Sequence, residues 1–168
     1  MIPKPTFDQQ VSINEMQMRG LYLSIACDVE FVLTDLICAC LASTNQQKED
    51  IKAALFEKVM MDRKIKMAKE VLQKYNTQHF EVNKPFLKKF EELKGYRNML
   101  AHARITGDPE SKDTNILVME FVQDGQNQQK KEHMNNLKAK LEGFRVAVNG
   151  LLLLVALIYT EKDLRANP

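Results

Sequence analysis

A stretch from Gln9 to Ala42 contains no proline and a single glycine, and this feature limits the fold more than any other. Apolar residues return there at steps of three and four, which places them along one side of a helix. The members of this stripe are Leu21, Ile25, Val29, Val32, Leu36 and Cys40. One helix of this length at the front of a 168-residue chain predicts a mainly helical domain built around it.

Four further helices follow from the same spacing. The pattern predicts them over about 47–60, 62–75, 85–103 and 132–163. Pro85 suits the first turn of the third of these, because that position needs no backbone N–H.

Between the last two helices the pattern changes from helix to strand. The β-like run Asn115–Val122 is followed by Asp124 and Gly125, a pair typical of a tight hairpin. The predicted fold is therefore all-α: an up-and-down bundle of four to five helices with a small β-hairpin insertion before the last helix. We expect a single domain over residues 1–168, with a flexible N-terminus at 1–8 and the loop and hairpin insertion at 104–131.

Composition excludes several classes of protein. The 24 basic and 22 acidic side chains leave a net charge of +2, so no global positive field attracts nucleic acid. The spacing of the three cysteines matches no zinc site. We expect them to be small core residues of a protein in a reducing compartment. The apolar run Leu151–Tyr159 is shorter than the ~20 residues that a membrane span needs. We expect a cytoplasmic protein without a membrane contact.

Arg97 conflicts with the apolar pattern of its helix. On a helical wheel it lies among the apolar positions Phe86, Phe90, Leu93 and Leu100. Because an unpaired buried charge is costly, we expect Arg97 to have a partner or to line a wet cleft. Glu30, whose neighbours on the first helix are apolar, is a candidate partner. A structural salt bridge and a functional site both remain open at this point.

The residues that follow Arg97 read Arg97-Asn98-Met99-Leu100-Ala101-His102. This stretch resembles the signature of the HEPN superfamily, the higher eukaryotes and prokaryotes nucleotide-binding domains. The resemblance implies an all-helical bundle with Arg97 and His102 as the active pair and Asn98 as a supporting polar residue. In active members of the family, the corresponding arginine and histidine resemble a metal-independent ribonuclease centre that the two subunits of a dimer share.

That chemistry suits these side chains. Imidazole titrates near neutrality, so His102 can act as a general acid or base. Guanidinium stays charged and binds phosphate oxygens, so Arg97 can stabilise charge that develops at phosphorus. Arg104 and Lys94 are candidate phosphate contacts. In a toxin branch of the family a tyrosine stands two residues after the histidine, whereas Arg104 stands there in this chain, so an antitoxin that acts on that tyrosine is not supported.

The last helix is apolar all round at Leu151–Leu154, which predicts burial on more than one side and hence a homodimer. The function expected is metal-independent RNA cleavage that leaves 2′,3′-cyclic phosphate ends, in a toxin or phage-defence context with a protein antitoxin or defence partner. The alternative is a non-catalytic module that binds a nucleotide, RNA or a protein in the same cleft. We expect no cofactor and no metal.

Overall fold

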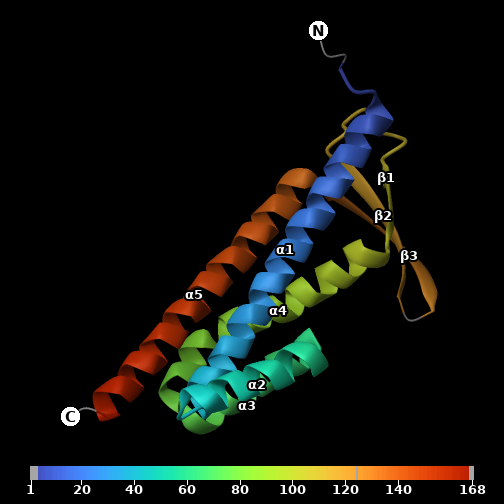
Figure 1. Ribbon diagram of the computed structural model, residues 1–168. Coiled ribbons are helices and arrows are strands. Elements are labelled where there is room, and N and C mark those ends of the chain that lie inside the picture. The colour runs from blue at the N-terminus through green and yellow to red at the C-terminus, as the bar shows by residue number, and fades with distance from the viewer. Residues whose placement is uncertain (1–3, 124, 167–168) are drawn as a thin grey trace. The chain divides into compact units, whose positions relative to one another are not determined.

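The structure is a computed structural model that describes residues 4–123 and 125–166. Helices make up most of this part of the chain, and three short strands follow the fourth helix (Figure 1). The elements are α1 (Phe7–Leu41), α2 (Asn45–Lys58), α3 (Met61–Tyr75), α4 (Thr77–His102), β1 (Arg104–Gly107), β2 (Ile116–Gln123), β3 (Gln126–His133) and α5 (Met134–Ala166). The predicted mainly helical fold is confirmed. Of the segment predicted to be flexible, residues 1–3 lie outside the described residues and Phe7 already belongs to α1.

The chain divides into two compact units. Unit 1 comprises Met1–Ile25 and Gly95–Gly143, and unit 2 comprises Ala26–Lys94 and Phe144–Pro168. Helices α1, α4 and α5 each contribute one end to unit 1 and the other to unit 2.

The described part of unit 2 consists of helices and their short connections, and its core is formed by apolar side chains from α1, α3, α4 and α5. Its fully or almost fully buried members include Val29, Leu33, Leu36, Ile37, Ala68, Leu72, Leu87, Phe90, Leu93, Phe144, Leu151 and Ile158. The predicted period of three and four along 9–42 corresponds to this buried stripe of α1.

Unit 1 joins helix ends to an antiparallel sheet with strand order β1-β2-β3 (Figure 1). Strands β2 and β3 pair from Ile116 opposite His133 to Gln123 opposite Gln126. Gly125, in the two-residue connection, has a φ of 75°, a conformation that glycine adopts without strain. Strand β1 was not expected, because four residues carry too little alternation to predict a strand.

Helix α4 begins earlier than predicted. It includes Pro85 in its interior, whereas the sequence indicated a loop up to Asn83 and a helix start at Pro85. The Asn83 side chain donates to the carbonyl oxygen of His79 at 2.8 Å, in the turn before the proline.

Among the described residues, one helical segment, Met134–Asp163, is long and apolar enough by length and composition to cross a membrane. The nine-residue run considered in the sequence is therefore only part of a longer apolar stretch. Of its most apolar window, 44% is buried within the protein, and core helices of soluble proteins also pass this test.

Candidate functional site at the end of helix α4

Three of the residues predicted for the site lie on the last two turns of α4. Arg97, Asn98 and His102 are all exposed. At 3.6 residues per turn, Asn98 lies about 100° and His102 about 140° around the helix from Arg97. The three side chains therefore share one exposed arc of unit 1, with Arg97 and His102 at its two edges.

The prediction that Arg97 lies on the apolar face of its helix is wrong. Its guanidinium lies in solvent and donates from Nη1 to Oδ1 of Asn98 at 3.0 Å. The helical wheel assumes that the apolar stripe of Phe86 and Phe90 continues to the end of the helix. In unit 1 the buried face of α4 instead contains Leu100, about 60° from Arg97, so the stripe does not continue in the same direction.

Glu30 has a different partner from the one considered. Lys64 of α3 donates from Nζ to Oε2 of Glu30 at 3.2 Å, and both residues belong to unit 2. The Lys64 side chain is 0% exposed, whereas that of Glu30 is 40% exposed. This pair stabilises a buried ammonium, so Glu30 has a structural role in unit 2 and no contact that assigns it to the α4 site.

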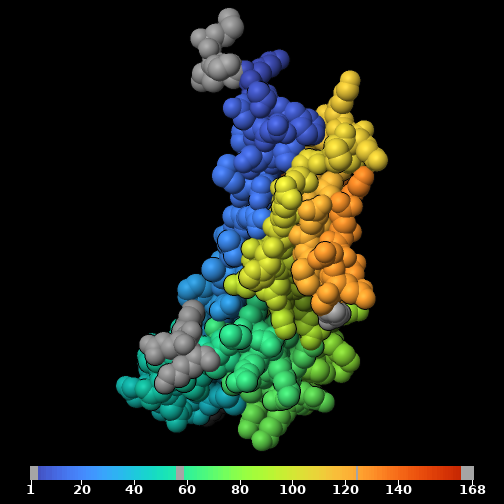
Figure 2. Space-filling view, turned by 90° about the vertical axis from the view of Figure 1, so that its right-hand side faces the viewer, coloured from blue at the N-terminus to red at the C-terminus, as the bar shows by residue number. Residues whose placement is uncertain are grey.

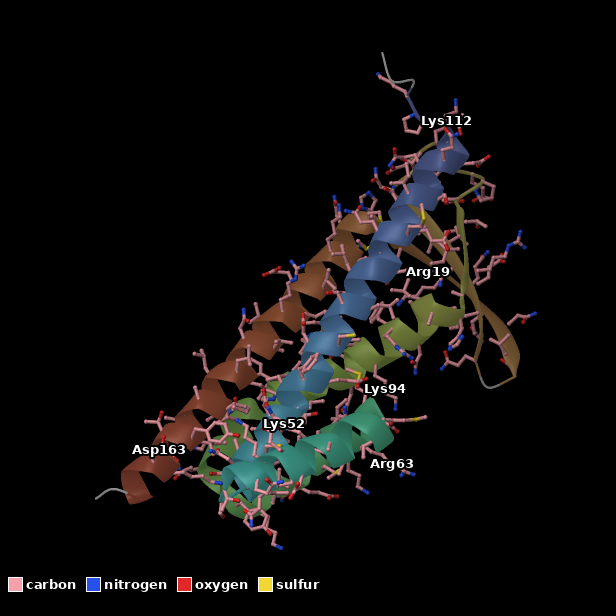
Figure 3. The ribbon with its side chains drawn as sticks, viewed as in Figure 1. Arg19, Lys52, Arg63, Lys94, Lys112 and Asp163 are labelled. Carbon is pink, nitrogen blue, oxygen red and sulfur yellow. The ribbon has the colours of Figure 1, made fainter. Side chains whose placement is uncertain are left out.

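Arg19 holds the end of α4 in place, and the sequence analysis did not single it out. Its Nη2 donates to the carbonyl oxygen of Ala103 at 2.6 Å, and its Nη1 donates to that of Leu100. Figure 3 shows Arg19 beside the last turns of α4. Carbonyls at a helix C-terminus have no partner within the helix, and a cation there also offsets the helix dipole. Arg19 therefore fixes the turn that carries His102.

A cluster of charges packs behind the same helix end. The Glu132 carboxylate accepts from Lys140 at 2.7 Å, from Lys130 at 3.0 Å and from the Tyr96 hydroxyl at 3.4 Å. Both ammonium groups also lie 4.7 Å from the centre of the Tyr96 ring. Burial alone would raise the pKa of Glu132, but the hydrogen bonds from Lys140 and Lys130 outweigh it and hold this pKa below its usual value.

Tyr22 supports Tyr96 from α1. The two rings are 5.9 Å apart, and the buried Tyr22 hydroxyl donates to the carbonyl oxygen of Leu137 at 3.0 Å. Burial raises the pKa of Tyr22 far above its ordinary range, so this phenol stays protonated. Together the cluster and Tyr22 make the inner side of the helix end rigid.

His102 opens onto a surface hollow of about 480 Å³. This volume is within the range of small-ligand sites, roughly 300–1,000 Å³. The lining residues are His102, Arg104, Glu120, Phe121, Val122, Asn127, Gln128 and Gln129. Figure 2 faces the strands that form most of this lining, with β1 to β3 side by side in yellow to orange. The hollow includes two of the predicted residues, His102 and Arg104, but its lining does not include Arg97 or Asn98.

The wall of this hollow contains a row of polar side chains across the sheet. Arg104 on β1 pairs in register with Glu120 on β2, and Glu120 pairs with Gln129 on β3. Residues directly opposite in an antiparallel sheet point to the same face. The Gln129 amide donates to Oε1 of Glu120 at 3.4 Å.

The predicted phosphate contacts divide between the units. Arg104 lines the hollow of unit 1, whereas Lys94 belongs to unit 2 and lies 3.6 Å from the carboxylate of Asp62. Of the basic residues that the sequence places on α3, Lys69 pairs with Glu91 at 2.6 Å and Lys64 is buried. Ion pairs therefore neutralise much of this surface, although Figure 3 shows Arg63 extended from α3.

A second hollow, of about 530 Å³, lies in unit 2 beside the start of α2. Its two lysines are engaged within the protein. Lys162 donates to the carbonyl oxygen of Ala42 at 2.8 Å, and the Lys48 ammonium lies 4.8 Å from the centre of the Tyr159 ring. None of the residues predicted for the site lines it.

Among residues 4–123 and 125–166, no group of three or more histidine, cysteine, aspartate or glutamate side chains is arranged to hold a metal ion. No protein-family model matches this chain, and neither a curated protein nor a solved structure matches it. The resemblance to the HEPN superfamily therefore rests on residues 97–102, and their geometry must support any function assigned to them.

Proposed function

We propose that the protein is an endoribonuclease of HEPN type that cleaves RNA without a metal ion. The observation that carries this proposal is the position of His102. It is an exposed imidazole at a helix end that Arg19 holds in place, and it opens onto a hollow that also contains Arg104. The up-and-down helical bundle and the homodimer that the resemblance implies are part of this proposal. So are the cytoplasmic location and a toxin or phage-defence context with a protein antitoxin or defence partner.

The reaction requires a proton donor or acceptor and a cation beside the phosphate. In RNA the 2′-hydroxyl of the substrate attacks the adjacent phosphorus, so neither a metal-bound water nor a cofactor is needed to supply the nucleophile. His102 exchanges a proton with the reacting oxygen, and Arg104 binds the non-bridging phosphate oxygens in the hollow. Arg97 and Asn98, along the same exposed arc, bind the backbone of the strand as it leaves the hollow.

A second candidate is a module that binds RNA or a nucleotide without cleaving it. The observation in its favour is that Arg97 and His102 lie about 140° apart around α4, so they do not form a closed pair within one chain. In that case the hollow and the arc hold the ligand, and no bond is broken.

The test is cleavage of a mixed RNA pool in the presence of EDTA. We expect wild-type protein to produce 2′,3′-cyclic phosphate and 5′-hydroxyl ends. His102→Ala should reduce the rate by about 10²–10⁴-fold, which is the usual contribution of a general acid or base. Arg104→Ala should weaken cleavage by lowering phosphate affinity.

The matched control is His133→Ala. His133 is half-buried in unit 1, 3.4 Å from Asp113, and it is not part of the hollow. This variant should cleave at the wild-type rate. RNA that binds to the folded wild-type protein but stays intact, with binding weakened by Arg104→Ala, would replace cleavage by the binding function.

A further inference from the structure

The proposed nuclease has one histidine in each hollow, but transesterification of RNA needs both a base and an acid. The base removes the proton of the 2′-hydroxyl, and the acid protonates the 5′-oxygen that leaves. A dimer could supply a second His102. The hollow of a single chain, however, already contains a carboxylate, that of Glu120.

We propose that Glu120 is the general base of this hollow and that His102 is its general acid, so one chain holds the complete catalytic set. This inference rests on the proposed ribonuclease function. It adds a catalytic residue outside the Arg97–His102 stretch, on a strand that carries none of the residues of the resemblance.

The backbone fixes the three groups without a flexible loop. His102 is the last residue of α4, and Arg104, the first residue of β1, follows two residues later. The ladder between β1 and β2 then places Glu120 directly opposite Arg104. Groups held on regular elements keep their catalytic geometry better than groups on loops.

Glu120 also has the exposure and the unused hydrogen-bonding capacity that a base needs. Its side chain is exposed, and its oxygen Oε1 accepts a long hydrogen bond from the Gln129 amide at 3.4 Å. A carboxylate accepts up to about four hydrogen bonds. Its other oxygen, Oε2, can therefore accept from a 2′-hydroxyl in the hollow.

In this assignment Oε2 of Glu120 takes the proton of the 2′-hydroxyl as the 2′-oxygen forms its bond to phosphorus. The bond between phosphorus and the 5′-oxygen breaks, and the imidazolium of His102 donates a proton to that oxygen. The products are a 2′,3′-cyclic phosphate and a 5′-hydroxyl. Proton exchange with water returns Glu120 to the carboxylate and His102 to the imidazolium. Arg104 binds the non-bridging oxygens throughout.

The decisive experiment compares Glu120→Gln with wild type in kcat/KM against pH, with RNA as substrate and EDTA present. The kcat/KM of wild type should depend on pH as a bell-shaped curve. Its fall at low pH (the acid limb) reports a carboxylate that must be ionised, and its fall at high pH reports an imidazole that must be protonated. Glu120→Gln should lower the maximum about 10²-fold or more and should remove the acid limb, which a purely structural role of Glu120 would leave in place. Glu110→Gln, an exposed glutamate of the same unit, is the control and should match wild type.

A mixing experiment tests whether the set belongs to one chain. When Glu120→Gln and His102→Ala proteins are combined, each hollow still lacks one group, so activity should stay as low as in either variant alone. Restored activity would show that base and acid come from different subunits and would overturn the assignment. Unchanged cleavage and an intact acid limb in a folded Glu120→Gln protein would also overturn it, while the His102 result stands. If the wild-type protein cleaves no RNA, the proposed function and this inference are both wrong.

Discussion

The Glu132 carboxylate is the residue whose ionisation contributes most clearly to the stability of unit 1. It is 9% exposed and accepts hydrogen bonds from two ammonium groups and a phenol. Since its pKa lies below the usual value of 4.5, the folded protein takes up this proton less readily than the unfolded chain. The resulting stability is fully present above pH 4.5 and is lost as the pH falls below it.

Glu132→Gln should therefore lower the free energy of unfolding at pH 7 by roughly 1.5–3 kcal/mol, the range for hydrogen bonds to charged groups. The gap between variant and wild type should narrow as the pH falls below 4.5, because wild type then loses the same charge. Urea unfolding at a series of pH values measures this gap. A gap that stays constant down to pH 3 would contradict the role given to the carboxylate.

Arg19 and Glu120 show why parts of the site escaped the sequence. Arg19 binds a carbonyl that lies 81 residues away along the chain, and no local pattern marks such a pair. Glu120 is the one charged residue in the β-like run Ile116–Val122, and that run predicts a strand but not the residue opposite Glu120. Glu120 lies opposite Arg104 only because of the register between β1 and β2. That register cannot be predicted from a sequence in which β1 itself is not recognised.

Among the elements, the helices were predictable because their spacing repeats over many turns. The error at Arg97 arose because the apolar stripe was assumed to run straight along the helix. The buried face of α4 in fact changes direction between Phe90 and Leu100. The error at Pro85 arose because a proline that suits the first turn of a helix can also lie inside a helix, as Pro85 does in α4. The sequence singled out His102 and Arg104, which line the hollow, because the histidine ends a recognisable local motif and the arginine stands two residues after it.

Helix α5 offers a matched pair of glycines. A Cβ at Gly143 would meet nothing within 4 Å, whereas a Cβ at Gly150 would lie 2.7 Å from Cζ and 3.0 Å from Cδ2 of Phe86. Gly143→Ala should raise the free energy of unfolding by about 0.8–1 kcal/mol, because alanine favours a helix interior. Gly150→Ala should lower it by roughly 1–3 kcal/mol, because the Phe86 ring has to move. Chemical denaturation of both variants measures the difference. Equal effects would show that Phe86 does not limit the space at Gly150.

At the scale of the whole molecule, three helices connect the two units without a break. The crossing points are Ile25–Ala26, Lys94–Gly95 and Gly143–Phe144. Because melting one unit would interrupt three continuous helices, we expect a single cooperative unfolding transition. Hydrogen exchange in increasing urea should give the same midpoint for peptides from 116–133 and from 61–75. Glu132→Gln should lower both midpoints together. Two separate midpoints, with only that of 116–133 moved, would show that the units unfold independently.

The hydrogen bond from Tyr22 to Leu137 joins groups that are 115 residues apart in the chain. During synthesis, the front of α1 leaves the ribosome long before the strands and the start of α5 that cover it. At about 5–20 residues per second, this surface waits roughly 6–23 seconds for its partners. Over that interval the side chains that are buried in the folded protein remain exposed to solvent, among them Val11, Met18 and Tyr22. The order of the sequence thus leaves an apolar helix surface uncovered in the nascent chain, and it delays assembly of the hollow beside His102 until most of the protein has been made.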